Sequence, residues 1–224
     1  MYKRQTENCG ISHATLPGKP RPGTVGLPYD GVQCRLDPAS GEIQVKAPCL
    51  MLGYFKDPEL TRQAFTDDGW LRTGDKGALD EEGNLRITGR VKDLFKTDKG
   101  KYVAPAPIEN RINAHPMIEM SMVSGVGQPS AYAMVVLAEH LRPRQSDAAF
   151  RAEVEAELSA LLNQINQEVA DYEQLRMIVV AGEPWSIENG MLTPTMKIRR
   201  ARIEGAVEPQ VGRWYGARGT VIWS

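Results

Sequence analysis

The sequence contains few cysteines and few histidines. Its 3 cysteines, Cys9, Cys34 and Cys49, are widely spaced, and none has a second cysteine two residues away. An odd number of such thiols does not form a disulfide framework, and the spacing does not match a zinc site. The 3 histidines also lack a partner at metal-ligand spacing. We therefore assign the cysteines and histidines no chemistry.

Long apolar runs and an excess of one charge are also missing. No stretch of about twenty apolar residues is present to span a membrane, and the first ten residues lack the apolar core of a secretory signal. The formal net charge is -1, and residues 197–202 form the only dense basic run. A balanced charge provides no long-range field for nucleic acid or anionic lipid. We expect a cytoplasmic globular protein with no nucleic-acid partner and no membrane span.

The composition allows one large or two small domains. Of the 224 residues, 42% are hydrophobic and 25% are charged, which is enough to bury a core. The first 90 or so residues are rich in glycine and proline and contain short runs that alternate between apolar and polar side chains. This pattern predicts a small β-rich part with antiparallel strands and tight turns. The expected strands are 32–36, 41–46, 71–79 and 85–91, with turns at 37–41 and 80–84.

One helix is expected within this β-rich part. Residues 57–59 supply a helix N-cap, a proline in the first turn and an acid that suits the helix dipole. Leu60, Ala64 and Phe65 are expected to form its buried face.

After residue 91 the pattern changes to a mixture of helices and strands. The apolar spacing predicts a small sheet flanked by helices, so the fold class of the whole chain is α+β. The last helix is interrupted by Gly205, Pro209 and Gly212, which are poor helix formers. The expected helices are 106–114, 146–170 and 200–215, and the expected strands are 118–126, 131–138 and 177–181.

Thr73-Gly74-Asp75 is the first candidate for chemistry. A small residue beside a carboxylate lets the acid approach a ligand, and a carboxylate that accepts two hydroxyls suits a ribose diol. A Gly-Asp pair alone is more often a simple turn, so the neighbouring motifs decide between these two interpretations.

Three motifs follow one another in this region. They are Arg72–Asp75 (RTGD), Gly89–Asp93 (GRVKD) and Tyr102–Glu109 (YVAPAPIE), and residues 53–61 (GYFKDPELT) precede them. The ordered set resembles the carboxy-terminal signature of adenylate-forming enzymes, most closely the long-chain acyl-CoA synthetase branch. The resemblance implies that residues 1–91 are the β-rich end of an incomplete large AMP-binding domain. Residues 92–224 would then form the mobile small domain.

The resemblance also implies roles for single residues. Asp75 and Arg90 match the residues that hold the ribose of ATP or of the acyl-adenylate, and Lys92 matches the pivot of domain rotation. Thr6 and Glu7 match the end of a Tyr-Gly-x-Thr-Glu element, in which threonine contacts the phosphate and glutamate binds Mg²⁺. Lys3 and Arg4 stand where that element has tyrosine and glycine, and a plain surface Thr-Glu pair is the competing interpretation.

A second informative stretch is the loop LTPTMK at residues 192–197. It coincides with the adenylation loop of the family, and Lys197 matches the lysine that contacts both the carboxylate substrate and ATP. An ammonium group suits this task because negative charge builds on the phosphoryl oxygens as a carboxylate attacks the α-phosphorus. Gly100 matches the glycine that lines the pantetheine path of CoA, although Asp98 and Lys99 replace the small residues usual before it. A solvated linker and a solvated hairpin tip are the competing interpretations of these two segments.

The chain lacks one element that such an enzyme needs. No glycine-rich Ser/Thr loop followed by lysine is present to wrap the ATP phosphates, so we expect the chain to be the carboxy-terminal part of a longer enzyme and inactive alone. The expected activity is that of an ATP-dependent acyl-CoA synthetase, an acid-thiol ligase that uses ATP, Mg²⁺ and CoA and releases AMP. The alternatives are a carrier-protein-loading adenylate-former and a non-catalytic remnant. An upstream reading frame with the phosphate loop would distinguish a ligase from a remnant.

Overall fold

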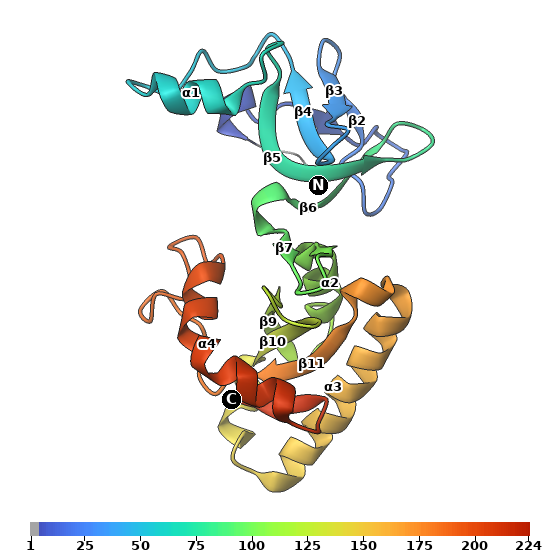
Figure 1. The fold of residues 1–224 in the computed structure, drawn as a ribbon. Helices are drawn as coiled ribbons and strands as arrows, with labels where there is room; N and C mark the ends of the chain where they lie inside the picture. Colours follow the sequence, from blue (N-terminus) through green and yellow to red (C-terminus); the bar gives the residue numbers. More distant parts are fainter. Residues whose placement is uncertain (1–4) are drawn as a thin grey trace. The chain divides into compact units, whose positions relative to one another are not determined.

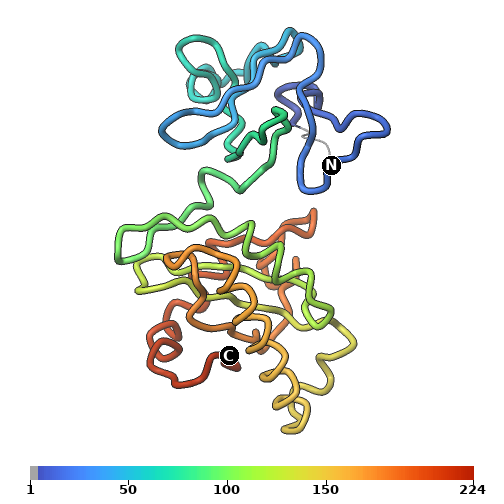
Figure 2. The backbone as a smooth tube through the Cα atoms, turned by 90° about the vertical axis from the view of Figure 1, so that its right-hand side faces the viewer, coloured from blue at the N-terminus to red at the C-terminus, as the bar shows by residue number. Residues whose placement is uncertain are grey.

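The computed structural model describes residues 5–224, so the family departure at Lys3 and Arg4 lies outside the described residues. The chain divides into two compact units, Met1–Asp93 and Leu94–Ser224, which are described separately below (Figures 1 and 2). The first unit is β-rich and the second mixes a sheet with helices, which confirms the expected α+β class.

The first unit is built on a four-stranded antiparallel sheet in the order β3-β4-β5-β6. Val25, Ile43, Val45 and Leu85 are buried on its inner side and form the core of this unit. A two-stranded ladder and two 3₁₀ helices complete it. The strands are β1 (His13–Ala14), β2 (Leu27–Pro28), β3 (Gln33–Leu36), β4 (Glu42–Lys46), β5 (Leu71–Leu79) and β6 (Leu85–Arg90), and the 3₁₀ helices are Thr6–Asn8 and Val91–Asp93.

The two predicted turns join neighbouring strands of this sheet. Asp37 Oδ2 accepts hydrogen bonds from the backbone N (2.8 Å) and Oγ (2.6 Å) of Ser40 between β3 and β4. Asp80 Oδ1 accepts a bond of 2.8 Å from the backbone N of Asn84 between β5 and β6. Aspartate is favoured in turns because its side chain can bond the backbone two to four residues further on.

Helix α1 (Pro58–Ala64) begins as the sequence predicts but buries less than expected. Asp57 Oδ1 accepts a hydrogen bond of 2.9 Å from the backbone N of Leu60, so Asp57 is the N-cap. The predicted buried face is wrong, because no residue of α1 is buried and Leu60 is 45% exposed. Ala64 and Phe65 are only half-buried. Contact with β5 covers the end of the helix only in part, and a bridge joins Phe65 to Leu71.

The second unit has a four-stranded sheet in the order β12-β11-β10-β9. β9 and β10 are antiparallel, whereas β11 runs parallel to both β10 and β12. A short hairpin and two 3₁₀ helices, Glu139–Arg144 and Asp171–Glu173, accompany it. The other elements are β7 (Phe95–Lys96), β8 (Tyr102–Val103), α2 (Pro105–Ile112), β9 (Ile118–Ser124), β10 (Ala131–Leu137), α3 (Ala148–Glu168), β11 (Leu175–Val180), α4 (Arg200–Gly216) and β12 (Val221–Trp223).

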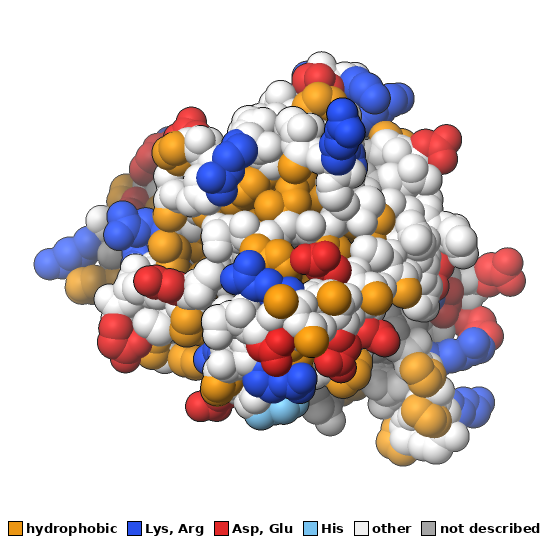
Figure 3. Space-filling view, turned by 90° about the horizontal axis from the view of Figure 1, so that it is seen from below, with side chains coloured by type: hydrophobic (Ala, Val, Ile, Leu, Met, Phe, Trp, Pro, Cys, Tyr) orange, Lys and Arg blue, Asp and Glu red, His pale blue; other side chains and the backbone are white. Residues whose placement is uncertain are grey.

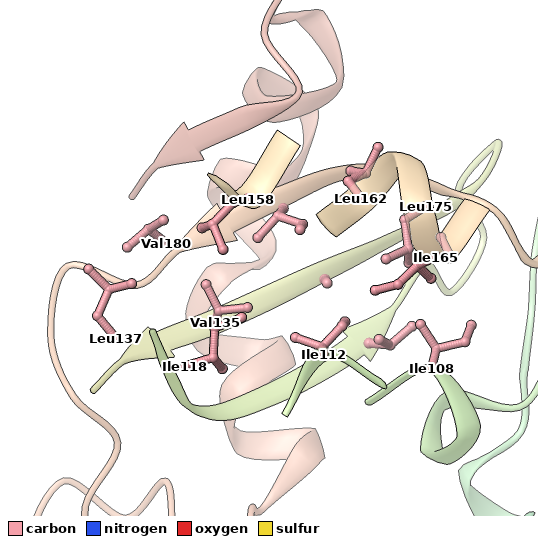
Figure 4. Close-up of a cluster of buried hydrophobic side chains, with 14 of the residues drawn as sticks. Ile108, Ile112, Ile118, Val135, Leu137, Leu158, Leu162, Ile165, Leu175 and Val180 are labelled. Atoms are coloured by element: carbon pink, nitrogen blue, oxygen red, sulfur yellow. The ribbon is translucent and has the colours of Figure 1, made fainter. Parts of the chain in front are cut away.

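Helices cover both faces of this sheet, and the alternation along β10 shows how. Ala133 and Val135 point into a core shared with α2 and α3, part of which Figure 4 shows. Tyr132, Met134 and Val136 point into a second core shared with α4. Because successive side chains of a strand face opposite sides, a strand covered on both faces is apolar throughout. β10 is accordingly buried along its whole length.

Two helices of this unit illustrate how local signals and packing combine. Asp147 caps α3 as expected, since its Oδ1 accepts from the backbone N of Ala149 at 2.8 Å. α4 continues through Pro209 in spite of its unfavourable residues. Its buried side chains, among them Ile203 and Trp214, lie at helical spacing against the sheet. Tertiary packing therefore outweighs low helix propensity here.

No described helix is both long and apolar enough to cross a membrane. On the face of the molecule shown in Figure 3, Lys and Arg side chains are interspersed with Asp and Glu side chains. This mixture agrees with the balanced formal charge of the sequence.

The three cysteines are free and differ in exposure, which gives a test of the first unit. Burial raises the pKa of the Cys34 thiol to about 11, whereas Cys9 is exposed. Because the thiolate is the reactive form, Cys34 should be alkylated on the order of a hundredfold more slowly than an ordinary thiol at pH 8. Mass spectrometry of iodoacetamide-treated protein should find Cys9 modified first and Cys34 modified only after urea is added. Equal rates in native protein would contradict the partly buried position of Cys34 in β3.

Candidate functional site

A cavity of about 350 Å³ lies beside strands β5 and β6 of the first unit. Its walls come from the amino-terminal segment, from β4 to β6, from α1 and the loop before it, and from the 3₁₀ helix after β6. The lining residues are Gln5, Glu7, Glu42, Tyr54, Leu60, Gln63, Ala64, Leu71, Arg72, Thr73, Gly74, Arg90 and Lys92.

Asp75 and Arg90 lie directly opposite each other in the β5-β6 ladder. Arg90 Nε is 3.3 Å from Asp75 Oδ1, and the side chains are 59% and 15% exposed, respectively. Residues that face each other across two antiparallel strands have side chains close enough to interact. The hairpin thus brings together two of the candidate residues and holds a largely covered carboxylate beside a guanidinium that is open to solvent.

The backbone before Asp75 is fixed by contacts with β4. Gly74 adopts a left-handed φ of 68°, and its backbone N donates to Glu42 Oε1 at 2.9 Å. Thr73 Oγ1 donates to the carbonyl of Ile43 at 2.7 Å and accepts from the backbone N of Asp75 at 3.2 Å. Glycine takes this φ without steric cost, so the chain can turn here and direct Asp75 toward Arg90.

Glu7 is held at the cavity by the loop between β4 and α1. Its Oε1 accepts from the Tyr54 hydroxyl at 3.0 Å, and its carbonyl accepts from the backbone N of Met51 at 2.8 Å. Burial and the Glu7 carboxylate raise the pKa of Tyr54, so Tyr54 remains a hydrogen-bond donor at neutral pH. Thr6, in contrast, is exposed and is not among the residues that line the cavity.

Glu7 is also the candidate metal ligand. Within residues 5–224 there is no group of three or more His, Cys, Asp or Glu that could hold a metal ion. Mg²⁺ keeps several waters and is often bound through one or two carboxylates together with substrate phosphates. A single carboxylate on an open cavity therefore fits Mg²⁺ that arrives with a nucleotide, and does not fit a metal site made of protein ligands alone.

Lys92 completes the group of candidates in the first unit. It lies in the 3₁₀ helix Val91–Asp93, is exposed and lines the same cavity as Glu7 and Arg90. Three cations, Arg72, Arg90 and Lys92, and two carboxylates, Glu7 and Glu42, thus border this cavity, and Asp75 lies beside Arg90. Such a set can bind a polar ligand that carries hydroxyl groups and negative charge.

Lys197 lies in the second unit, at the end of a tight loop. The backbone N of Thr193 donates to the carbonyl of Lys197 at 2.8 Å, and Thr193 Oγ1 accepts from the backbone N of Lys197 at 3.1 Å. Met196 adopts a left-handed φ of 59°, which closes the turn. A bridge between Leu192 and Ile198 joins the two ends of the loop. The loop is ordered by its own backbone, while the Lys197 side chain is exposed.

Gly100 also lies in the second unit, in the turn between β7 and β8. It has a φ of 77°, and its backbone N donates to the carbonyl of Thr97 at 3.0 Å. The backbone N of Asp98 donates to the carbonyl of Gln128 at 3.0 Å, which ties this turn to the loop between β9 and β10. Lys99 and Gly100 are both exposed. The segment is a hairpin tip, and the geometry by itself gives Gly100 no ligand.

Glu42 and Tyr54 shape the cavity but were not singled out by the sequence. Glu42 is buried in β4 and binds the Gly74 amide, and its Oε2 is 3.6 Å from Arg72 Nη1. The available signal was an acid at the start of a strand in which Ile43 and Val45 are apolar. Tyr54 belongs to the motif GYFKDPELT, but only the structure shows that it contacts Glu7.

The chain thus combines a β-rich unit that contains a cavity of about 350 Å³ with an α+β unit that carries an ordered lysine loop. Residues 92–218 match the family model described as the AMP-binding enzyme C-terminal domain. The match covers more than half of the 224 residues, so the chain belongs to this family.

The relatives are ligases that are much longer than this chain. Long-chain-fatty-acid–CoA ligase FadD15 of Mycobacterium tuberculosis is 37% identical over 190 residues, which cover 80% of this chain and 31% of the ligase. Long-chain-fatty-acid–CoA ligase 5 of Mus musculus is 32% identical over 234 aligned positions, covering 94% and 34%. The chain therefore spans about a third of the length of these relatives.

A solved structure gives the same picture of the fold. The anthranilate CoA ligase AuaEII, in complex with anthranoyl-AMP, superposes with a TM-score of 0.68 and 26% identity. The matched region covers 93% of this chain and 38% of that ligase. The expected family and its likeness to long-chain fatty acid–CoA ligases are thus confirmed.

Proposed function

We propose that this chain is the carboxy-terminal portion of an ATP-dependent acyl-CoA synthetase. The full enzyme would join a fatty acid to CoA through an acyl-adenylate, with release of pyrophosphate and then AMP, in the cytoplasm. The observation that carries this proposal is the Asp75-Arg90 pair beside a cavity that Glu7 and Lys92 also border. The partners would be the carboxylic acid, ATP, CoA and the remaining part of the large domain, upstream of this chain.

In this proposal the first unit holds the nucleotide. Asp75 accepts hydrogen bonds from the ribose hydroxyls, and the exposed Arg90 side chain moves from Asp75 to a hydroxyl or phosphate oxygen. Thr6 donates to a phosphate oxygen, and Glu7 holds Mg²⁺ together with the phosphates. When bound, Mg²⁺ would neutralise phosphate charge. Tyr54 keeps one Glu7 oxygen engaged, so the other Glu7 oxygen would be the one to hold the metal.

Lys197 serves the first half-reaction. A carboxylate oxygen forms a bond to the α-phosphorus of ATP, and the bond to the oxygen that bridges to pyrophosphate breaks. Both reactants are anions, so an ammonium group placed between them lowers their repulsion and stabilises the charge that develops. The ordered loop of Thr193 to Lys197 fixes the backbone from which this group extends, which reduces the conformational search.

Lys92 and Gly100 serve the second half-reaction. The second unit rotates about Lys92. The CoA sulfur then attacks the acyl carbon, and AMP leaves. The hairpin that contains Gly100 then lines the pantetheine path, where absence of a side chain leaves room for the thiol arm. Lys197 and Gly100 lie in separate loops of one unit, so rotation of that unit can exchange one for the other.

ATP-pyrophosphate exchange tests this proposal. The 224-residue chain alone should show no exchange that depends on a carboxylic acid, because it contains no glycine-rich phosphate loop. A version extended upstream to the length of the relatives should exchange with long-chain fatty acids.

A panel of carboxylic acids of increasing chain length serves as the control for substrate class. Robust acid-dependent exchange by the 224-residue chain, or none by the extended version with any acid, would overturn the proposal. Exchange without later CoA thioester formation would favour the carrier-protein-loading alternative.

A further inference from the structure

A largely covered ion pair connects three elements of the second unit. Arg200 Nη2 is 2.7 Å from Glu109 Oε1, and the two side chains are only 18% and 12% exposed, respectively. Arg200 Nη1 donates to the carbonyl of Val123 at 2.7 Å. Glu109 Oε1 also accepts from the backbone N of Val123 at 2.8 Å. The pair therefore binds both the backbone N and the carbonyl of Val123 in β9, and it connects α2, α4 and β9.

Such a pair is poorly explained by stability alone. Removing two charges from water costs free energy, and an apolar pair of similar volume is often as stable. What a guanidinium fork adds is fixed direction, since its donors lie in one plane and here bind two separate acceptors. The Glu109-Arg200 pair accordingly fixes where α4 starts relative to β9.

The start of α4 is also the end of the Lys197 loop. Arg200 is the first residue of α4 and follows Lys197 by three positions, and no side chain caps the helix at Arg199. The backbone N of Arg199 donates to the carbonyl of Met191 at 2.8 Å, and Leu192 pairs with Ile198. The two sides of the loop base are thus joined to each other immediately before Arg200, the residue that Glu109 binds.

We propose that Glu109 and Arg200 are positioning residues for Lys197, an inference that rests on the proposed function. The hydrogen bonds within the loop fix its shape, and one further bond, from the backbone N of Leu192 to the carbonyl of Ser186 at 2.9 Å, joins the loop to the segment before it and not to the sheet. The Glu109-Arg200 pair supplies the direction by anchoring the loop base to the sheet. Without the pair, the whole loop can move relative to the sheet. The Lys197 ammonium group then spends less time beside the phosphoryl oxygens on which negative charge develops.

The test compares two double variants, each of which removes an ion pair between α2 and another helix. Glu109→Met with Arg200→Met removes the pair while keeping its volume apolar. The matched control, Arg111→Met with Glu168→Met, removes a more exposed ion pair (40% and 47%) that joins α2 to α3. Arg200→Lys is the conservative variant, since one ammonium cannot bind Val123 and Glu109 with the same fork geometry.

Two readouts are needed. In the 224-residue chain, hydrogen exchange of the amides of residues 191–199 should rise roughly tenfold in the first variant and stay unchanged in the control. In the upstream-extended enzyme, the adenylation rate should fall by about 10-fold to 100-fold, with less change in capture of a preformed acyl-adenylate by CoA. Arg200→Lys should fall between wild type and the double variant in both readouts.

Several outcomes would overturn the inference. Loop exchange equal to the control, or faster exchange without a loss of adenylation, contradicts a positioning role. Loss of adenylation with unchanged loop exchange also does, because the pair would then act by another route. If Lys197→Ala leaves adenylation intact, the proposed role of Lys197 fails, while the exchange data still decide whether the pair anchors the loop.

Discussion

Replacement of Lys197 by alanine is expected to lower the adenylation rate of the upstream-extended enzyme by about 10²-fold to 10³-fold. The reason is that the ammonium group acts where two anions meet, and removal of one preorganised donor from such a site costs this much. The fatty acid should still bind, so the loss should fall on kcat more than on KM. Single-turnover formation of the acyl-adenylate would measure it.

The same variant should retain most of the second half-reaction. Lys197→Ala enzyme supplied with synthetic acyl-adenylate and CoA should form thioester at a rate within a few-fold of wild type, because attack of the thiol uses a different face of the small unit. Arg199→Met is a suitable control, since it removes an exposed cation two residues away. Equal losses for Lys197→Ala and Arg199→Met would show that general positive charge, and not a placed lysine, is what matters.

Much of the second unit could be predicted from its sequence because local and tertiary preferences agree there. The stripe of apolar residues from Phe150 to Ile165 predicted α3, and in the structure these residues are buried except for Leu161, which is partly buried. Asp147 predicted the start of the helix and does cap it. Where capping, spacing and packing all favour the same helix, no alternative structure is favoured by the sequence and the prediction is reliable.

Other elements depended on contacts that no local pattern records. β12 (Val221–Trp223) was not predicted, because a three-residue strand at the end of the chain is defined by its pairing with β11. The short hairpin of β7 and β8 is likewise defined by pairing. The predicted buried face of α1 failed for the opposite reason, since its apolar residues have the right spacing but contact with β5 leaves none of the helix residues buried.

The candidate site divides in the same way. The motif order placed Asp75 and Arg90 in one ligand site, and the ladder register sets their side chains 3.3 Å apart. The motifs could not indicate Glu42, and they contain Glu109 without indicating that it pairs with Arg200, because these residues act through backbone groups of distant strands. Roles that depend on the chemistry of one side chain are thus easier to infer from sequence than roles that depend on where it is held.

The second large effect is expected in the first unit, where Gly26 supports the strand that carries Arg90. The carbonyl of Gly26 accepts from the backbone N of Leu85 at 2.9 Å, and the backbone N of Val25 donates to the carbonyl of Leu85 at 2.7 Å. Gly26 has a φ of 85°, and a Cβ there would lie 2.0 Å from the carbonyl oxygen of Ala14. The backbone of β1 or the contact with β6 would have to shift.

Gly26→Ala should therefore destabilise the first unit by about 2 to 5 kcal/mol, the sum of the left-handed φ and the overpacking. Gly31→Ala isolates the first term, because Gly31 has a φ of 80° with nothing within 4 Å of its Cβ position, and should cost about 1 to 2 kcal/mol. Hydrogen exchange measured across a urea titration would give the stability of β6 in the first unit and of β10 in the second unit separately. Only the amides of β6 should lose protection. Equal costs for the two variants would mean that the segment around Ala14 yields freely, and that Gly26 does not hold β6 in place for Arg90.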